Sequence, residues 1–117
     1  MSVVHQDRVT GLNFLPAVVT RRPDDTTHFL SSDAMRHLLA QAAEKFDYVL
    51  IDAPPVGPAV DVRALAHMVD GFVMVAEWGV TTMDAVRRVA GSEFIHPKLL
   101  GTVLTKANLK AYRTFSA

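Results

Sequence analysis

A short apolar run that ends in an aspartate and two prolines constrains the fold of this chain more than any other feature. The run reads Phe46-Asp47-Tyr48-Val49-Leu50-Ile51-Asp52-Ala53-Pro54-Pro55. Aromatic and β-branched residues bounded by turn residues are typical of a buried strand. Because proline has no backbone N–H, the strand has to end here. The pattern therefore predicts a buried strand at residues 48–51 with the carboxylate of Asp52 at its carboxyl end.

Strand-like and helix-like patterns alternate along the rest of the chain. We expect further strands at residues 12–19, 71–76 and 99–104. Three amphipathic helices are expected: one capped by Ser31, Ser32 or Asp33, one capped by Asp61, and one capped by Thr81 or Thr82. Apolar strands separated by such helices indicate an α/β fold, with a parallel sheet flanked by helices on both faces. Residues 1–10 are expected to be a polar lead-in, 11–105 a domain and 106–117 a polar tail.

Composition excludes several classes of function. Twelve acidic side chains balance twelve basic ones, so charge gives no reason to expect nucleic acid as a partner. The chain has no Cys, which excludes disulfides, thiol catalysis and cysteine-ligated metals. No apolar run approaches the roughly 20 residues that span a bilayer. We therefore expect a chain that is soluble by itself, without direct membrane insertion.

Asp52 has two interpretations. A carboxylate at the carboxyl end of a parallel strand is where a nucleoside triphosphatase holds Mg²⁺, usually through water. Alternatively, Asp52 only ends a strand. In this sequence no Gly precedes Lys, so the G-x-x-x-x-G-K-[ST] loop that cradles phosphates is absent. On the first interpretation the chain carries half of a nucleotide site.

Several segments occur in an order that resembles a known family. They are Gly11 to Ala17, Leu30 to Leu39, Phe46 to Pro55, Asp61 to Ala66, Val69 to Gly71 and Leu100 to Leu104. This order resembles the cytoplasmic domain of the bacterial tyrosine autokinases of capsular and exopolysaccharide biosynthesis. Those kinases belong to the deviant Walker class of P-loop ATPases, which includes division-site and partition ATPases. The resemblance implies a P-loop NTPase-like fold that lacks its N-terminal phosphate-loop portion, which would lie before Met1.

The resemblance also assigns roles to individual residues. Asp52 matches the Walker B aspartate, which serves catalysis and holds Mg²⁺ through water. Thr105 stands where the family often has an Asn near the adenine, and Asp61 either faces the nucleotide or caps a helix. The strand exit at Glu77 carries an acid where a basic residue is common, and Tyr112 is the remaining candidate phosphoacceptor. The implied cofactor is Mg-ATP, although the chain alone is expected to bind none and to show little catalysis.

The resemblance implies partners as well. They are a membrane-embedded polysaccharide chain-length regulator or full-length kinase subunits, with a homo-oligomer expected. Two alternatives stay open: a non-enzymatic interaction module of the export machinery, and a partition or division ATPase relative. If the phosphate-loop strand lies upstream, backbone groups at the sheet centre lack partners. We then expect a marginal, dimeric or rearranged fold.

Overall fold

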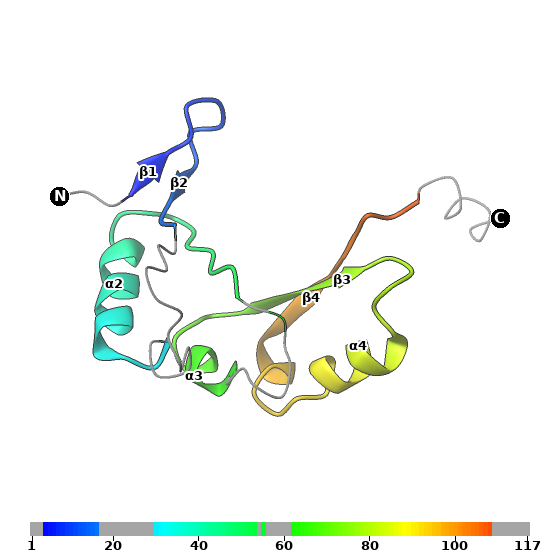
Figure 1. Ribbon diagram of the computed structural model, residues 1–117. Coiled ribbons are helices and arrows are strands. Elements are labelled where there is room, and N and C mark those ends of the chain that lie inside the picture. Colours follow the sequence, from blue (N-terminus) through cyan, green and yellow to red (C-terminus); the bar gives the residue numbers. More distant parts are fainter. Residues whose placement is uncertain (1–3, 17–29, 54, 56–61, 109–117) are drawn as a thin grey trace, which may run out of the picture.

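The computed structural model describes residues 4–16, 30–53, 55 and 62–108. A short hairpin opens the described chain, and three helices and a pair of strands follow (Figure 1). The elements are β1 (His5–Gln6), β2 (Asn13–Phe14), α2 (Asp33–Ala43), α3 (Val62–Ala66), β3 (Phe72–Glu77), α4 (Met83–Ala90), a 3₁₀ turn (His96–Lys98) and β4 (Leu99–Thr105).

The hairpin formed by β1 and β2 is antiparallel and pairs His5 with Phe14. Its turn is closed by Asp7, whose carboxylate accepts hydrogen bonds from the backbone N–H of Thr10 at 2.9 Å and from the Thr10 hydroxyl. Gly11 adopts a φ of 74°, a conformation that glycine reaches without strain. The hairpin therefore spans residues 5–14. The strand expected at 12–19 is only two residues long here, and its positions 17–19 lie outside the described residues.

Two helices begin where the sequence predicts. The Ser32 side chain accepts a hydrogen bond from the backbone N–H of Met35 at 3.2 Å, which caps α2. In the same way, the Thr82 hydroxyl caps α4 by accepting from the N–H of Ala85 at 3.2 Å. The cap expected for α3, Asp61, lies outside the described residues. Local capping chemistry thus fixes both observed helix starts.

The two long strands confirm the predicted parallel pairing. β3 and β4 run parallel, with Val75 opposite Val103 and Glu77 opposite Thr105. α4 connects them, which is the usual way to join parallel neighbours. Lys98 fastens the amino end of this unit, because its ammonium group donates to the carbonyl oxygens of Ala66 at 2.7 Å and Val69 at 2.8 Å. The result is a β3–α4–β4 unit that is connected to α3 by the hydrogen bond from Lys98 to Ala66.

The strand predicted at residues 48–51 does not form, so that prediction is wrong. The segment has no ladder partner among the residues that the structure describes. Tyr48 is 88% exposed and Leu50 90% exposed, although both belong to the most strand-like run of the sequence. A strand that is apolar on both faces is stable only between neighbours and under covering helices. Within the described ranges this segment has no neighbouring strand, because the ladders join only β1 with β2 and β3 with β4.

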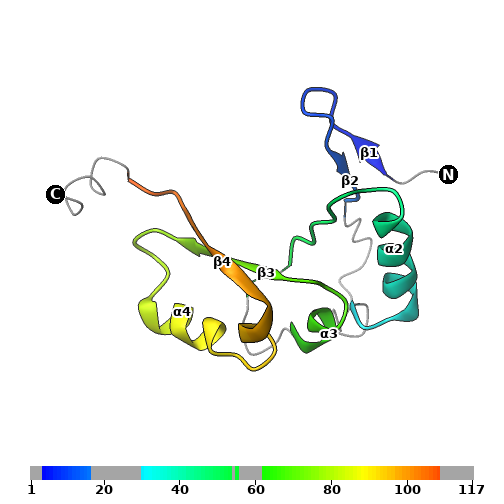
Figure 2. The same cartoon turned by 180° about the vertical axis from the view of Figure 1, so that it is seen from behind.

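Burial falls on one face of β3 alone, because on β4 both Val103 and Leu104, which point to opposite faces, are about half exposed. Ala76 is 2% exposed, and Leu65 and Ile95 are each 3% exposed, so the small core lies among β3, α3 and the segment before β4. The Arg63 guanidinium lies over the Phe94 ring, 5.3 Å from its centroid, and closes this core at one side. Figures 1 and 2 show α3 and α4 below the strands in both views. On the other face of β3, Val73 is 55% exposed and Val75 64% exposed, so the expectation of helices on both faces is wrong for the described part of the chain.

Candidate functional site

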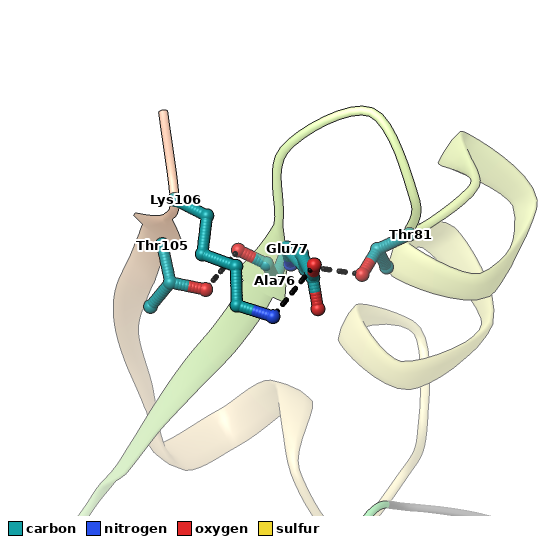
Figure 3. Close-up of polar contacts among 5 residues, drawn as sticks. All are labelled: Ala76, Glu77, Thr81, Thr105 and Lys106. Carbon is teal, nitrogen blue, oxygen red and sulfur yellow. Dashed lines mark hydrogen bonds and ion pairs between the residues drawn. The ribbon is translucent and has the colours of Figure 1, made fainter. Parts of the chain in front are cut away.

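The carboxyl ends of β3 and β4 are the part of the described chain where a ligand site is expected. In open parallel sheets, ligands gather beyond the carboxyl ends of the strands. Glu77 and Thr105 are the last residues of the two strands and are paired in register. Figure 3 shows these two side chains together with Thr81 and Lys106. Glu77 and Thr105 lie side by side because they are opposite each other in the parallel ladder.

Several backbone and hydroxyl groups at this edge already form hydrogen bonds with one another. The Thr105 hydroxyl donates to the carbonyl oxygen of Ala76 at 3.3 Å (Figure 3). The backbone N–H of Trp78 donates to the carbonyl oxygen of Thr105 at 3.0 Å. The Thr81 hydroxyl accepts from the backbone N–H of Glu77 at 2.9 Å. These bonds lengthen the ladder past the last strand residues and fix the turn that leads into α4.

An ion pair neutralises the edge. The Lys106 ammonium lies 2.8 Å from a carboxylate oxygen of Glu77 (Figure 3). Lys106 has a φ of 54°, in the left-handed region that non-glycine residues seldom occupy. Its side chain is 72% exposed, so the pair is screened by water and contributes little stability. Because the cation is matched by an acid, the edge offers a phosphate no unbalanced positive charge.

The predicted residues are not brought together as one site. Thr105 lies at the carboxyl edge of the strand pair, with its hydroxyl proton directed to backbone. Asp52 is exposed, belongs to no strand, and makes no hydrogen bond or ion pair with other described residues. Asp61 and Tyr112 lie outside the described residues. Of the three predicted site residues, the described structure therefore holds only Thr105 at the edge. Asp52 has no described neighbour that would orient its carboxylate.

The described residues do not by themselves fit Mg-ATP. A carboxylate such as Asp52 is the type of ligand Mg²⁺ prefers. Within the described ranges, however, no group of three His, Asp or Glu side chains is arranged to hold a metal ion. Lys98 is bonded to α3 at the amino end of β4, opposite the candidate edge. The described residues therefore supply neither a three-ligand metal group nor a lysine free of an acid partner at this edge.

The pairing of Glu77 with Lys106 is not predicted by the sequence. The strand patterns indicate only an acid at the exit of one strand and a lysine after the end of another. The signal that identifies the pair is the register, because Lys106 directly follows the residue opposite Glu77. Register between two strands depends on long-range packing, which the pattern of either strand alone does not contain.

An open groove of about 670 Å³ lies away from this edge, between α2 and the turn after α3. Its lining residues are Arg36, Leu39, Ala40, Ala43, His67, Met68 and Asp70. Arg36 also lies 3.7 Å from Asp33 on its own helix. In the described chain, no helix has both the length and the hydrophobicity needed to cross a membrane.

Comparison with known proteins gives relatives of one kind. The chain is 36% identical over 112 residues to the succinoglycan biosynthesis transport protein ExoP of Rhizobium meliloti, which covers 94% of this chain and 14% of that protein. It is 31% identical over 87 residues to the tyrosine-protein kinase CpsD of Streptococcus agalactiae, covering 74% of this chain and 38% of the kinase. Identity to the tyrosine-protein kinase YwqD of Bacillus subtilis is 28% over 94 residues, or 80% of this chain and 40% of that kinase.

These matches cover most of this chain but less than half of each relative. No family model matches the chain. No solved structure matches it either. The fold is therefore known from the structure itself, and the family from the relatives. The agreement among a transport protein and several kinases shows that this chain belongs to the bacterial tyrosine kinases and chain-length regulators of capsular and exopolysaccharide biosynthesis.

Proposed function

We propose that this chain is the C-terminal part of a tyrosine-autokinase-like P-loop ATPase domain that serves exopolysaccharide or capsular polysaccharide biosynthesis. The observation that carries the proposal is the 36% identity to a succinoglycan biosynthesis transport protein over 94% of the chain. The parallel β3–α4–β4 unit is consistent with it, since P-loop domains are built from such units. Cytoplasmic location, with membrane association through a partner, follows from the same proposal.

The chain by itself is inactive in this proposal. Phosphoryl transfer depends almost entirely on positioning and on stabilising charge around the phosphates. Asp52 is exposed and unpartnered among the described residues, and the only cation at the candidate edge, within those residues, is matched by Glu77. Asp52, Asp61 and Thr105 become nucleotide-site residues only when further chain supplies the phosphate grip. That chain belongs either to a longer parent or to a full-length kinase subunit.

Calorimetry of Mg-ATP binding tests the inactive state. We expect no heat of binding up to millimolar Mg-ATP, and the same flat trace for Asp52→Ala. A full-length tyrosine kinase of the same family serves as the positive control. Micromolar binding to this chain that disappears in Asp52→Ala would contradict the proposal, because it would mean that the chain holds a complete site.

A second candidate is a non-enzymatic module that binds the polysaccharide export machinery. It is favoured by the neutral, internally bonded edge around Glu77 and Thr105, which offers little to a nucleotide. Deletion of the gene in its host tests whether the chain acts in polysaccharide biosynthesis at all. We expect a change in polysaccharide yield or chain length whether the chain is a module or part of a kinase site. Asp52→Ala restores the wild-type product if the chain is a module, and fails to restore it if Asp52 completes a kinase site.

A further inference from the structure

Tyr48 presents both its ring and its hydroxyl to solvent. Tyrosine usually buries the apolar body of its ring and leaves only the hydroxyl in water. Tyr48 instead is 88% exposed, and its hydroxyl makes no hydrogen bond to another described residue. The phenol oxygen is therefore open to a reacting partner.

The backbone on both sides of Tyr48 is accessible as well. Residues 46–53 belong to no helix or strand, and residues 43–50 are all exposed (Figure 1). A tyrosine kinase has to take the acceptor hydroxyl, together with its neighbours in the chain, into its own active site and hold them there in a reactive position. A tyrosine within a paired strand would first have to leave its sheet. The segment around Tyr48 meets the requirement without any unfolding.

We propose that Tyr48 is a phosphoacceptor for a tyrosine kinase of the family to which this chain belongs. The inference rests on the proposed function, which makes a full-length kinase subunit a partner of the chain. Relatives of this chain are themselves tyrosine-protein kinases. The Tyr48 phenol oxygen attacks the γ-phosphorus of an ATP held by that kinase. An O–P bond forms, the bond to the β–γ bridging oxygen breaks, ADP leaves, and the phenol proton passes to a base of the kinase.

A phosphate on Tyr48 opposes the entry of residues 48–51 into a sheet. Phosphorylation adds a charge of about −1.5 to −2 and three acceptor oxygens. Strands of a parallel sheet are buried on both faces, and burying an unpaired charge costs far more than burying a neutral hydroxyl. Asp52 follows Tyr48 by four residues, so the same pairing is what would position its carboxylate. Modification of Tyr48 therefore keeps Asp52 out of a nucleotide site.

Phosphopeptide mapping by mass spectrometry tests the site. The full chain is incubated with Mg-ATP and the purified kinase CpsD of Streptococcus agalactiae, whose autophosphorylation shows that it is active, and the chain is also recovered from its own host. The chain has two tyrosines, so Tyr48→Phe, which removes only the hydroxyl, has Tyr112→Phe as its matched control. We expect phosphate on Tyr48 in the wild type and in Tyr112→Phe, and its loss in Tyr48→Phe. Phosphate on Tyr112 alone, or an unmodified Tyr48 both with the active kinase and in the host, would overturn the proposal.

This result is separable from the test of the proposed function. A chain that binds the kinase while its Tyr48 stays unmodified would refute only the phosphoacceptor. Phosphate on Tyr48 in a chain that also binds Mg-ATP at micromolar concentration would support the phosphoacceptor and contradict the inactive state.

Amide hydrogen exchange at residues 48–51 tests the consequence of the modification. In a mixture with the kinase we expect the unmodified segment to become protected, and the phosphorylated segment to exchange at least tenfold faster. Tyr48→Phe, which keeps the ring and accepts no phosphate, should stay protected after incubation with Mg-ATP. Equal exchange in the modified and unmodified chains would refute the effect of the phosphate on strand pairing.

Discussion

Replacing Lys98 by Met should destabilise the chain more than the loss of an exposed ion pair does. The Lys98 ammonium is half-buried and donates to the carbonyl oxygens of Ala66 and Val69, at 2.7 Å and 2.8 Å. These are carbonyls in and just after the last turn of α3, which the helix itself cannot satisfy. Met keeps the aliphatic part of the side chain and removes only the donor. The change therefore isolates the two hydrogen bonds.

The magnitude follows from these contacts. A hydrogen bond from a charged donor contributes about 1.5–3 kcal/mol when its partner is left unpaired without it. Ala66 is 6% exposed, so its carbonyl regains little hydration, whereas Val69 is only half-buried and the loss at its carbonyl should be smaller. We therefore expect a total loss of about 2 kcal/mol, close to one full bond and a fraction of the second. For a domain of this size that corresponds to a fall in Tm of about 10 °C.

Urea unfolding followed by the fluorescence of Trp78, the single tryptophan, measures this loss. All variants are compared at one protein concentration, because association would add to the apparent stability. Lys106→Met is the matched control: its ion pair with Glu77 is exposed and should contribute about 0–1 kcal/mol. The reasoning fails if Lys98→Met stays within about 0.5 kcal/mol of the wild type, or if Lys106→Met costs as much.

Three smaller predictions follow from local contacts. Hydrogen bonds from the Thr10 side chain and backbone lower the pKa of Asp7 below its ordinary value of 3.8, so their stabilisation of the hairpin is complete above that value and is lost as the pH falls through the lowered pKa. NMR shifts of the hairpin should move at low pH in the wild type and not in Asp7→Asn. Gly79 has a φ of 73°, so Gly79→Ala should cost about 1 kcal/mol in urea unfolding and Gly79→Asn less, and equal costs would contradict the backbone argument. Thr82→Ala removes the α4 cap and should cost about 1 kcal/mol, whereas Thr82→Ser should cost almost nothing; an unaffected Tm in Thr82→Ala would show that the cap is not stabilising.

The features that the sequence predicts correctly depend on short-range interactions. Ser32 and Thr82 cap helices because a hydroxyl reaches a backbone N–H three residues ahead, whatever surrounds the helix. Strand β3 is predicted because every residue from Phe72 to Ala76 is apolar or small. The parallel arrangement follows from the intervening helix, since a short loop cannot join parallel neighbours.

The features that the sequence predicts wrongly depend on distant chain. Residues 48–51 have the composition of a central strand, but composition provides no ladder partner. The β1–β2 hairpin is not predicted, because two residues on each side of a turn give no detectable alternation. The Glu77–Lys106 pair escapes prediction because register is a property of two strands together.

The fate of Asp52 shows why a sequence motif is not yet a site. The motif places a carboxylate after an apolar run, and in a complete sheet the flanking strands would hold that carboxylate at the common carboxyl edge. Here the described chain gives the run no partner, so Asp52 is exposed while Thr105, which sits in a paired strand, is held in place. Strand pairing therefore fixes where a residue lies, and its side chain determines what it can bind. A chain can keep the carboxylate while lacking the paired strand that holds it in place. A partner strand that pairs with residues 48–51 would restore the position of Asp52 without any change in sequence.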